Sequence, residues 1–171
     1  MPYKAYQGGK DTTFRKPEKA DGHSIYQLID ECRPLDLNSQ YCYLLLCTHF
    51  RDTCIIAEND ESIVGFISGY IHPGQKDTIF IWQVAVSPSV RSRSIGSKML
   101  DNLVMREGLK GISKMETTIG PTNEESKRLF LSFARRMNAP CNESVFFPQS
   151  LFGEKIHEEE VLFSIGPFSR Y

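Results

Sequence analysis

The sequence predicts an α/β domain in which a mixed central β-sheet carries helices on both faces. Short apolar runs typical of strands alternate along the chain with segments whose apolar residues recur at helical spacing. The 171 residues are enough for one domain with a substantial core. The first residues are polar and contain glycine, so we expect a flexible N-terminal arm over residues 1–11 and a single domain over residues 12–171.

Five elements are expected before residue 75. Asp21 is suited to cap the first helix, Pro34 ends it, and Asn38 or Ser39 caps the second. A turn at residues 59–61 joins two strands into a hairpin. The elements are a strand at 12–15, a helix with Ile25, Leu28, Ile29 and Cys32 on its apolar face, a helix within 35–47, and strands at 53–58 and 62–72.

The second half of the sequence predicts alternating strands and helices. A capping box at Thr122 and Glu125 starts the last helix. Residues 138–157 have no regular pattern and are expected to form no element. The elements are a strand at 78–87, a helix with Ile95, Met99, Leu100, Leu103 and Val104, a strand at 114–118, a helix with Leu129, Phe130, Phe133, Ala134 and Met137, and a strand at Glu160–Ile165.

Composition excludes several classes of function. Twenty Lys and Arg balance 21 Asp and Glu, so no basic field favours nucleic acid or a membrane surface. No apolar run approaches the ~20 residues that span a bilayer, and the N-terminus lacks the apolar core of a signal peptide. Five cysteines without a C-x-x-C pair fit reduced thiols, so we expect a cytoplasmic protein. The four histidines lack metal-ligand spacing, and no metal is expected.

The segment from Gln83 to Leu100 reads as a strand, a short loop rich in small residues, and a helix. Amides at the start of that helix lack intrahelical partners, and the helix dipole adds positive charge there. Small residues allow a ligand to approach this backbone, which suits a pyrophosphate. The alternative is an ordinary turn between a strand and a helix.

Arg91-x-x-Ser94-x-Gly96 resembles the Arg/Gln-x-x-Gly-x-Gly/Ala signature of GCN5-related N-acetyltransferases, which hold acetyl-coenzyme A at such a loop. Ser94 replaces the usual first glycine, and a positive φ there would cost more for serine. The element order also matches the fold of that family. The resemblance implies acetyl-CoA contacts at Val84, Val86, Arg91, Arg93, Ser94, Ile95, Gly96, Ser97, Asn123 and Ser126.

Longer strings resemble one branch of that family, the diaminobutyrate acetyltransferases of the ectoine pathway. They lie at residues 33–47, 63–70, 81–86 and 116–123 and around His157-Glu158. The resemblance implies acetylation of the 4-amino group of L-2,4-diaminobutyrate by acetyl-CoA and, as is common among relatives, a homodimer. An acetyltransferase for another small amine, or a non-catalytic acetyl-CoA sensor, is the alternative.

The acceptor carries two ammonium groups, so its site needs carboxylates and flat walls. The resemblance implies Asp36, Tyr41, Trp82, His157 and Glu158 as substrate-binding residues, with Asp36, Glu158 and Trp82 as the catalytic set. Asp36 or Glu158 is the candidate base, acting directly or through water. Without the resemblance, the sequence alone favours Asp36 as a helix or turn cap, Trp82 as a core residue, and the His157-Glu158 pair as a solvated turn. The position at which many relatives have a tyrosine acid is Phe130.

Overall fold

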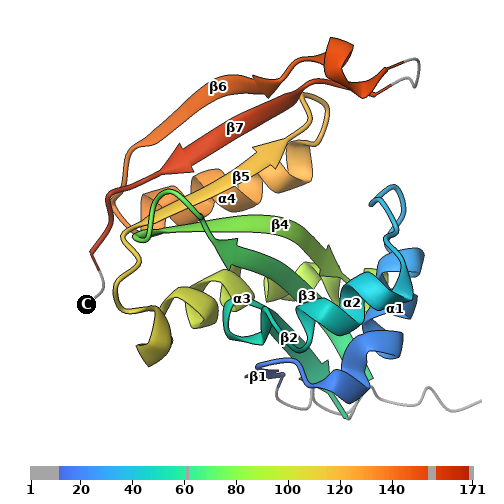
Figure 1. Ribbon diagram of the computed structural model, residues 1–171. Coiled ribbons are helices and arrows are strands. Elements are labelled where there is room, and N and C mark those ends of the chain that lie inside the picture. Colours follow the sequence, from blue (N-terminus) through green and yellow to red (C-terminus); the bar gives the residue numbers. More distant parts are fainter. Residues whose placement is uncertain (1–11, 61, 154–156, 170–171) are drawn as a thin grey trace, which may run out of the picture.

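The computed structural model describes residues 12–60, 62–153 and 157–169. They form one mixed seven-stranded sheet in the order β1-β2-β3-β4-β5-β7-β6, in which only the β4–β5 pair is parallel (Figure 1). The strands are β1 (Thr13–Arg15), β2 (Ile55–Asn59), β3 (Ser62–Ile71), β4 (Thr78–Val86), β5 (Lys114–Ile119), β6 (Cys141–Phe147) and β7 (Glu160–Ile165). The α-helices are α1 (Gly22–Glu31), α2 (Gln40–Leu46), α3 (Ile95–Val104) and α4 (Glu124–Arg136).

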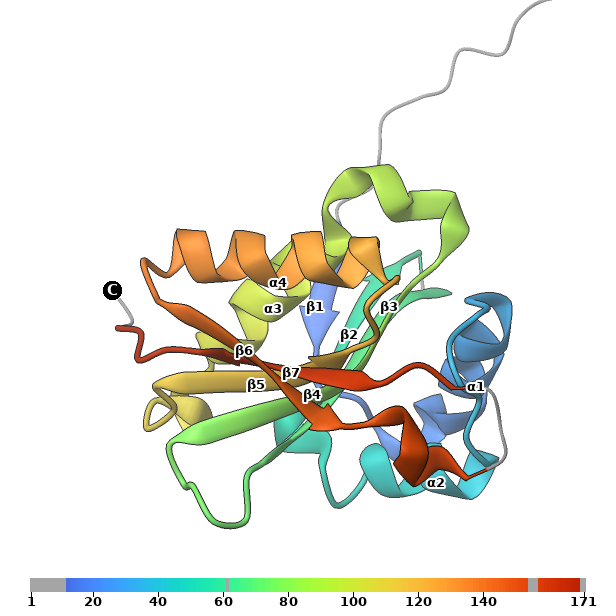
Figure 2. The ribbon, with the colours of Figure 1, turned by 90° about the horizontal axis from the view of Figure 1, so that it is seen from above.

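Helices cover both faces of the sheet, as the sequence predicts, with two on each face (Figure 2). On one face, Met99 of α3 and Phe133 of α4 are fully buried against the sheet. On the other face, Ile25 of α1 and Tyr43 of α2 are fully buried against β2, β3 and β4. Each helix thus buries its apolar stripe, which is the main stabilisation of an amphipathic helix in a protein.

A β-bulge interrupts the pairing of β3 with β4. Ser68 lies opposite Gln83 and Gly69 lies opposite Ile81, so Trp82 is an extra residue on β4. A bulge of this kind bends its strand and increases the local twist. The pairing of β4 with β5 ends at Ile81, although β4 continues to Val86.

The bulge also changes which residues of β4 face each helix layer. Before it, Ile79 and Ile81 belong to the core beneath α3 and α4, and after it Val84 and Val86 pack there. Trp82 and the next residue, Gln83, therefore both face the side of α1 and α2. A regular strand would have sent them to opposite faces.

The expectation that residues 138–157 form no element is wrong. Residues 141–147 form β6, an edge strand antiparallel to β7. Its side chains from Asn142 to Phe147 are all exposed, so no alternation of apolar and polar residues marks it in the sequence. The strand depends on backbone pairing with β7, which composition does not reveal.

The helix starts differ from expectation in two details. Asn123, rather than a Thr122–Glu125 box, caps α4, and its Oδ1 accepts the Ser126 amide. Asp21 does occupy the N-cap of α1, but its carboxylate binds Arg15 instead of the helix. Ser39 caps α2 as expected, accepting the amide of Cys42.

Arg15 joins three separate segments. Its guanidinium binds Asp21 at 2.8 and 2.9 Å and Glu58 at 3.0 and 3.1 Å, connecting β1, the start of α1 and β2. Hydrogen bonds from Arg15 lower the pKa of both carboxyls. Bidentate pairs between arginine and a carboxylate are among the strongest hydrogen-bonded ion pairs in proteins.

We predict that Arg15→Leu lowers the free energy of unfolding at pH 7 by roughly 1–2 kcal/mol, because two part-exposed pairs are lost. Both carboxyls titrate lower in the folded state, so their contribution is present above their unfolded pKa values. It is lost as pH falls through the folded values. Urea melts from pH 7 to pH 3 check this: the variant should converge on the wild type in acid. A difference that stays constant with pH contradicts it.

Candidate active site

A gap opens in the sheet where β4 leaves β5. The amide of Ser87 donates to the carbonyl of Val64, so Ser87 and, by alternation, Ala85 bond toward β3. The backbone amides of Val84 and Val86 therefore point to the β5 side, where the ladder has ended at Ile81 and Thr117. Main-chain donors are thus exposed along an extended strand, where a ligand can pair with them.

The N-terminus of α3 lies beside this gap. Lys98 makes the first intrahelical bond, to the carbonyl of Ser94, so the described contacts give no partner to the amides of Ile95, Gly96 and Ser97. Ser94 has φ 56° and ψ 31°, in the left-handed region, where glycine would be less strained than serine. Three amides at a positive helix end suit a phosphate.

The two arginines of the loop differ in their surroundings. Nε of Arg91 lies 3.5 Å from the carbonyl oxygen of Val86, which also accepts the thiol of Cys32 at 3.4 Å. Arg93 is exposed. Arg91 thus contacts the end of β4, but its side chain is exposed too, so both arginines remain accessible to an anion.

The start of α3 also approaches α4. A Cβ atom built on Gly96 would lie 3.5 Å from the side chain of Leu129 in α4 and 3.8 Å from that of Val86. The glycine therefore preserves a narrow space between α3, α4 and β4. Ser126 in the first turn of α4 is half-buried, and Asn123 is occupied as the helix cap.

On the other face, a buried network holds the loop that carries Asp36. Gln83 Nε2 donates to the main-chain oxygen of Asp36 at 2.7 Å, and its Oε1 accepts the hydroxyl of Tyr43 at 3.3 Å. The same hydroxyl accepts the amide of Asn38. This network fixes the Asp36 backbone against Gln83 of β4, while the Asp36 side chain is exposed. Sequence reasoning missed Gln83, although a glutamine inside an apolar strand was the available signal.

A cavity of about 480 Å³ opens on the same face, beside the gap. Trp82 and Thr118, the residues that follow the last β4–β5 pair, both line it. The remaining lining comes from β3, the loop after it, β4, β5, β6 and β7: Tyr70, His72, Gln75, Phe80, Glu116, Phe146, Phe147 and Leu162. Its walls are mostly aromatic, with a few polar groups, as in small-molecule sites.

The C-terminal candidates lie at the end of β5. An oxygen of Glu158 accepts the Thr122 amide at 3.3 Å, and the absence of a side chain on Gly120 leaves room for this carboxylate. Hydrogen bonds from Thr122 lower the pKa of Glu158, so it stays ionised at neutral pH. The ring of His157 stacks on Phe152 with centroids 3.9 Å apart. Tyr41 lies exposed in the first turn of α2.

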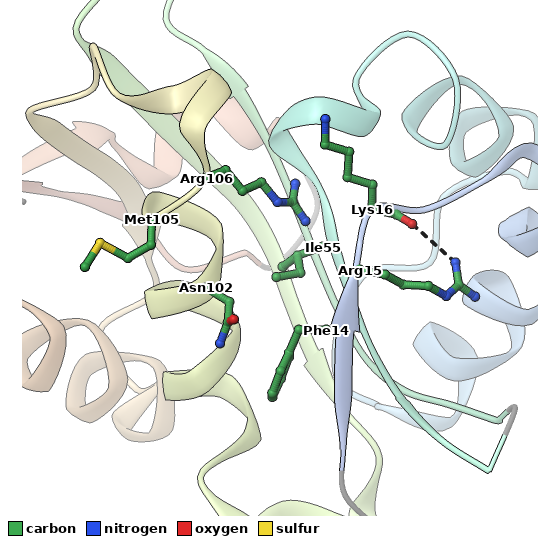
Figure 3. A pocket seen from close by; sticks show the side chains of 7 residues that line it. All are labelled: Phe14, Arg15, Lys16, Ile55, Asn102, Met105 and Arg106. Atoms are coloured by element: carbon green, nitrogen blue, oxygen red, sulfur yellow. Dashed lines mark hydrogen bonds between the residues drawn. The ribbon is translucent and has the colours of Figure 1, made fainter.

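A second cavity, of about 420 Å³, lies at the far edge of the sheet between β1 and α3 (Figure 3). Its floor includes Phe14 and Ile55, and its rim is basic. Arg15 is bound to two carboxylates, and Lys16 pairs with Asp52 at 2.6 Å. These charges are already compensated, and the cavity is separated from the gap by β2 and β3.

Residues 22–134 match the acetyltransferase (GNAT) family. This span includes the gap between β4 and β5, the α3 N-terminus and the loop of Asp36. Phe130, which occupies the position that the resemblance assigns to a tyrosine acid, is buried in the core and has no hydroxyl to donate. The chain belongs to the GNAT acetyltransferases.

Relatives of known activity identify one branch of the GNAT family. The chain is 43% identical to the L-2,4-diaminobutyric acid acetyltransferase of Bordetella parapertussis over 91% of its length and 84% of the relative. It is 45% identical to that of Chromohalobacter salexigens, covering 93% and 83%. A solved diaminobutyrate acetyltransferase from Paenibacillus lautus, in complex with L-2,4-diaminobutyric acid and coenzyme A, superposes with a TM-score of 0.91 at 42% identity, covering 96% and 99%. Within the GNAT acetyltransferases, the chain belongs with the diaminobutyric acid acetyltransferases.

We predict that Gly96→Leu raises the KM for acetyl-CoA at least about tenfold, because its side chain fills the space between Leu129 and Val86 next to the gap. Steady-state kinetics and calorimetry with acetyl-CoA check this. Gly96→Ala is the matched control, since its Cβ makes only ordinary contacts. Ser94→Gly should bind acetyl-CoA as the wild type does and relieve the positive φ. Unchanged acetyl-CoA binding by a folded Gly96→Leu variant contradicts the cofactor assignment.

Proposed function

We propose that this chain transfers the acetyl group of acetyl-CoA to the 4-amino group of L-2,4-diaminobutyrate, giving 4-N-acetyl-L-2,4-diaminobutyrate for ectoine biosynthesis. The observation that carries the proposal is the gap between β4 and β5. It joins three free amides at the start of α3 to an aromatic cavity on the opposite face. The relatives named for this substrate match over nine-tenths of the chain.

Acetyl-CoA is the co-substrate, and its contacts are assigned to the residues named from the sequence. The pyrophosphate pairs with the amides of residues 95–97, with Arg93 nearby. The pantetheine arm enters the gap and pairs with Val84 and Val86. Asn123 and Ser126 flank it from the start of α4. This path leaves the thioester beside Trp82, where the cavity opens.

The acceptor binds on the face that carries Trp82. Asp36 and Glu158 supply carboxylates for its ammonium groups, with Tyr41, Trp82 and His157 as walls. Trp82 is 46% exposed, so its ring face is available to a cation. The Gln83–Tyr43 network keeps the Asp36 loop against β4, which positions that carboxylate without contacting the substrate itself.

The reaction requires a neutral 4-amine. Asp36 or Glu158 removes its proton, directly or through water, and the amine attacks the thioester carbonyl. A backbone amide of β4 in the gap donates to the developing oxyanion. The attacking nitrogen gives up its remaining extra proton to water, and collapse of the intermediate expels the CoA thiolate, which leaves unprotonated or takes a proton from water. The lowered pKa of Glu158 keeps it ionised at neutral pH and makes it a weaker base than an ordinary glutamate.

We further propose that the protein acts as a cytoplasmic homodimer under osmotic stress. Val145, Phe146, Phe147 and Leu151 remain exposed on and after β6 instead of folding against the rest of the chain. β6 is also an unpaired sheet edge in the described structure. Among the described residues, no helix has the length and apolar character needed to cross a bilayer.

We predict that L-2,4-diaminobutyrate is acetylated far better than ornithine or lysine, since longer chains carry the attacking amine past the thioester. Asp36→Asn should lose most of the turnover with diaminobutyrate, about two decades in kcat/KM, while acetyl-CoA affinity stays nearly unchanged. A thiol-release assay over a panel of diamines and amino acids measures both. Asp52→Asn, at the far edge of the sheet beside Lys16, is a control with the same chemical change.

If ornithine or a polyamine is the better acceptor, or if Asp36→Asn is kinetically silent, the acceptor site is wrongly assigned. Acetyl-CoA binding without turnover on any amine would instead favour the sensor alternative.

We predict a mass of about twice that of the chain by light scattering at micromolar concentration. Replacing Phe146 and Leu151 together by serine should shift the protein toward the monomer, because both apolar side chains are exposed. A wild-type protein that is monomeric at this concentration refutes the dimer.

A further inference from the structure

Glu116 has an unusual position for a carboxylate. It lies on β5 opposite Phe80 and lines the cavity described above, where it is the only carboxylate among the described lining residues. Around it stand the rings of Tyr70, Phe80 and Trp82. An aromatic wall with one negative group is the chemistry that recognises an organic cation.

No cation of the described chain pairs with Glu116. Its side chain is half-buried, and its described hydrogen-bond partner is the neutral hydroxyl of Ser164, at 3.3 Å. Burial, and secondarily the negative charge of Glu116, raises the pKa of the neighbouring Tyr70. A partly desolvated carboxylate without a counter-charge is costly, and a cationic ligand removes that cost.

We propose that Glu116 binds the ammonium group of the acceptor that is not acetylated. The inference rests on the proposed function and adds a residue to its specificity. Trp82 and Thr118 line the cavity where the β4–β5 pairing has ended, and the proposed reaction places the attacking amine there. Glu116 is two residues before Thr118 on the same face, about 6–7 Å along the strand. That span suits a diamine with three carbons between its nitrogens plus one hydrogen bond.

The other candidate carboxylates are placed differently. Glu158 already accepts the amide of Thr122, beyond the end of β5. Asp36 is exposed on the loop that Gln83 holds. Glu116 is therefore the carboxylate best placed to distinguish a diamine from a monoamine inside the cavity.

The test compares L-2,4-diaminobutyrate with 4-aminobutyrate, which keeps the reacting amine and the carboxylate but lacks the second ammonium. We expect the wild type to prefer diaminobutyrate strongly. Glu116→Gln should reduce the ratio of the two kcat/KM values at least about tenfold, chiefly through a higher KM for diaminobutyrate, with the KM for acetyl-CoA unchanged. Glu116→Asp keeps the charge and should lose less of the preference.

Glu143→Gln is the matched control, because Glu143 lies on β6 near Cys141, which packs against the core on the α4 face. Thermal melts show whether each variant is folded. An unchanged ratio in Glu116→Gln, an equal loss of rate on both acceptors, or an equal effect of Gln and Asp overturns the role of Glu116 alone. A wild type that acetylates neither compound overturns the proposed function and this inference with it.

Discussion

The bulge at Trp82 is the constraint on which the site depends. By adding one residue to β4 opposite Ser68 and Gly69 of β3, it bends the strand at the point where pairing with β5 stops. The gap beyond Ile81 exists because β4 remains paired with β3 while it diverges from β5. Without that divergence the amides of Val84 and Val86 would be used within the sheet, and none would remain for a ligand.

The two faces of the sheet beside this bulge suit ligands of opposite charge. On the side of α3 and α4, small residues and free amides offer hydrogen bonds to an anion. On the side of α1 and α2, aromatic rings and the carboxylate of Glu116 suit a cation. The two ligands have opposite charge, so separate faces avoid competition for one site. In the proposed reaction, the gap is the place where their reactive atoms meet.

Packing on the face of α1 and α2 explains how the loop between these helices can hold Asp36 in a fixed place. The helices α1 and α2 are fixed by buried apolar contacts with β2, β3 and β4. Gln83 and Tyr43 then connect the loop between them to β4 through hydrogen bonds that have little access to water. Such bonds are costly to break, so the loop keeps its place. The exposed aromatic residues of β6 complete the cavity wall and also provide the apolar surface for a proposed second subunit.

The sequence by itself determined the helices, six of the seven strands and the loop before α3, because these rest on local patterns: apolar spacing, capping residues, and small residues before a helix. It also indicated that a positive φ at Ser94 would cost more for serine than for glycine, and the structure gives Ser94 a φ of 56°. The choice of Asp36, Tyr41, Trp82, His157 and Glu158 came from resemblance rather than pattern, and their roles stay predictions. Only the tertiary structure decided that β6 is a strand, that Trp82 is a bulge residue beside Gln83, and that Glu116 faces an aromatic cavity. Each of these depends on contacts between segments far apart in the chain, and such contacts leave no periodic signal in either segment alone.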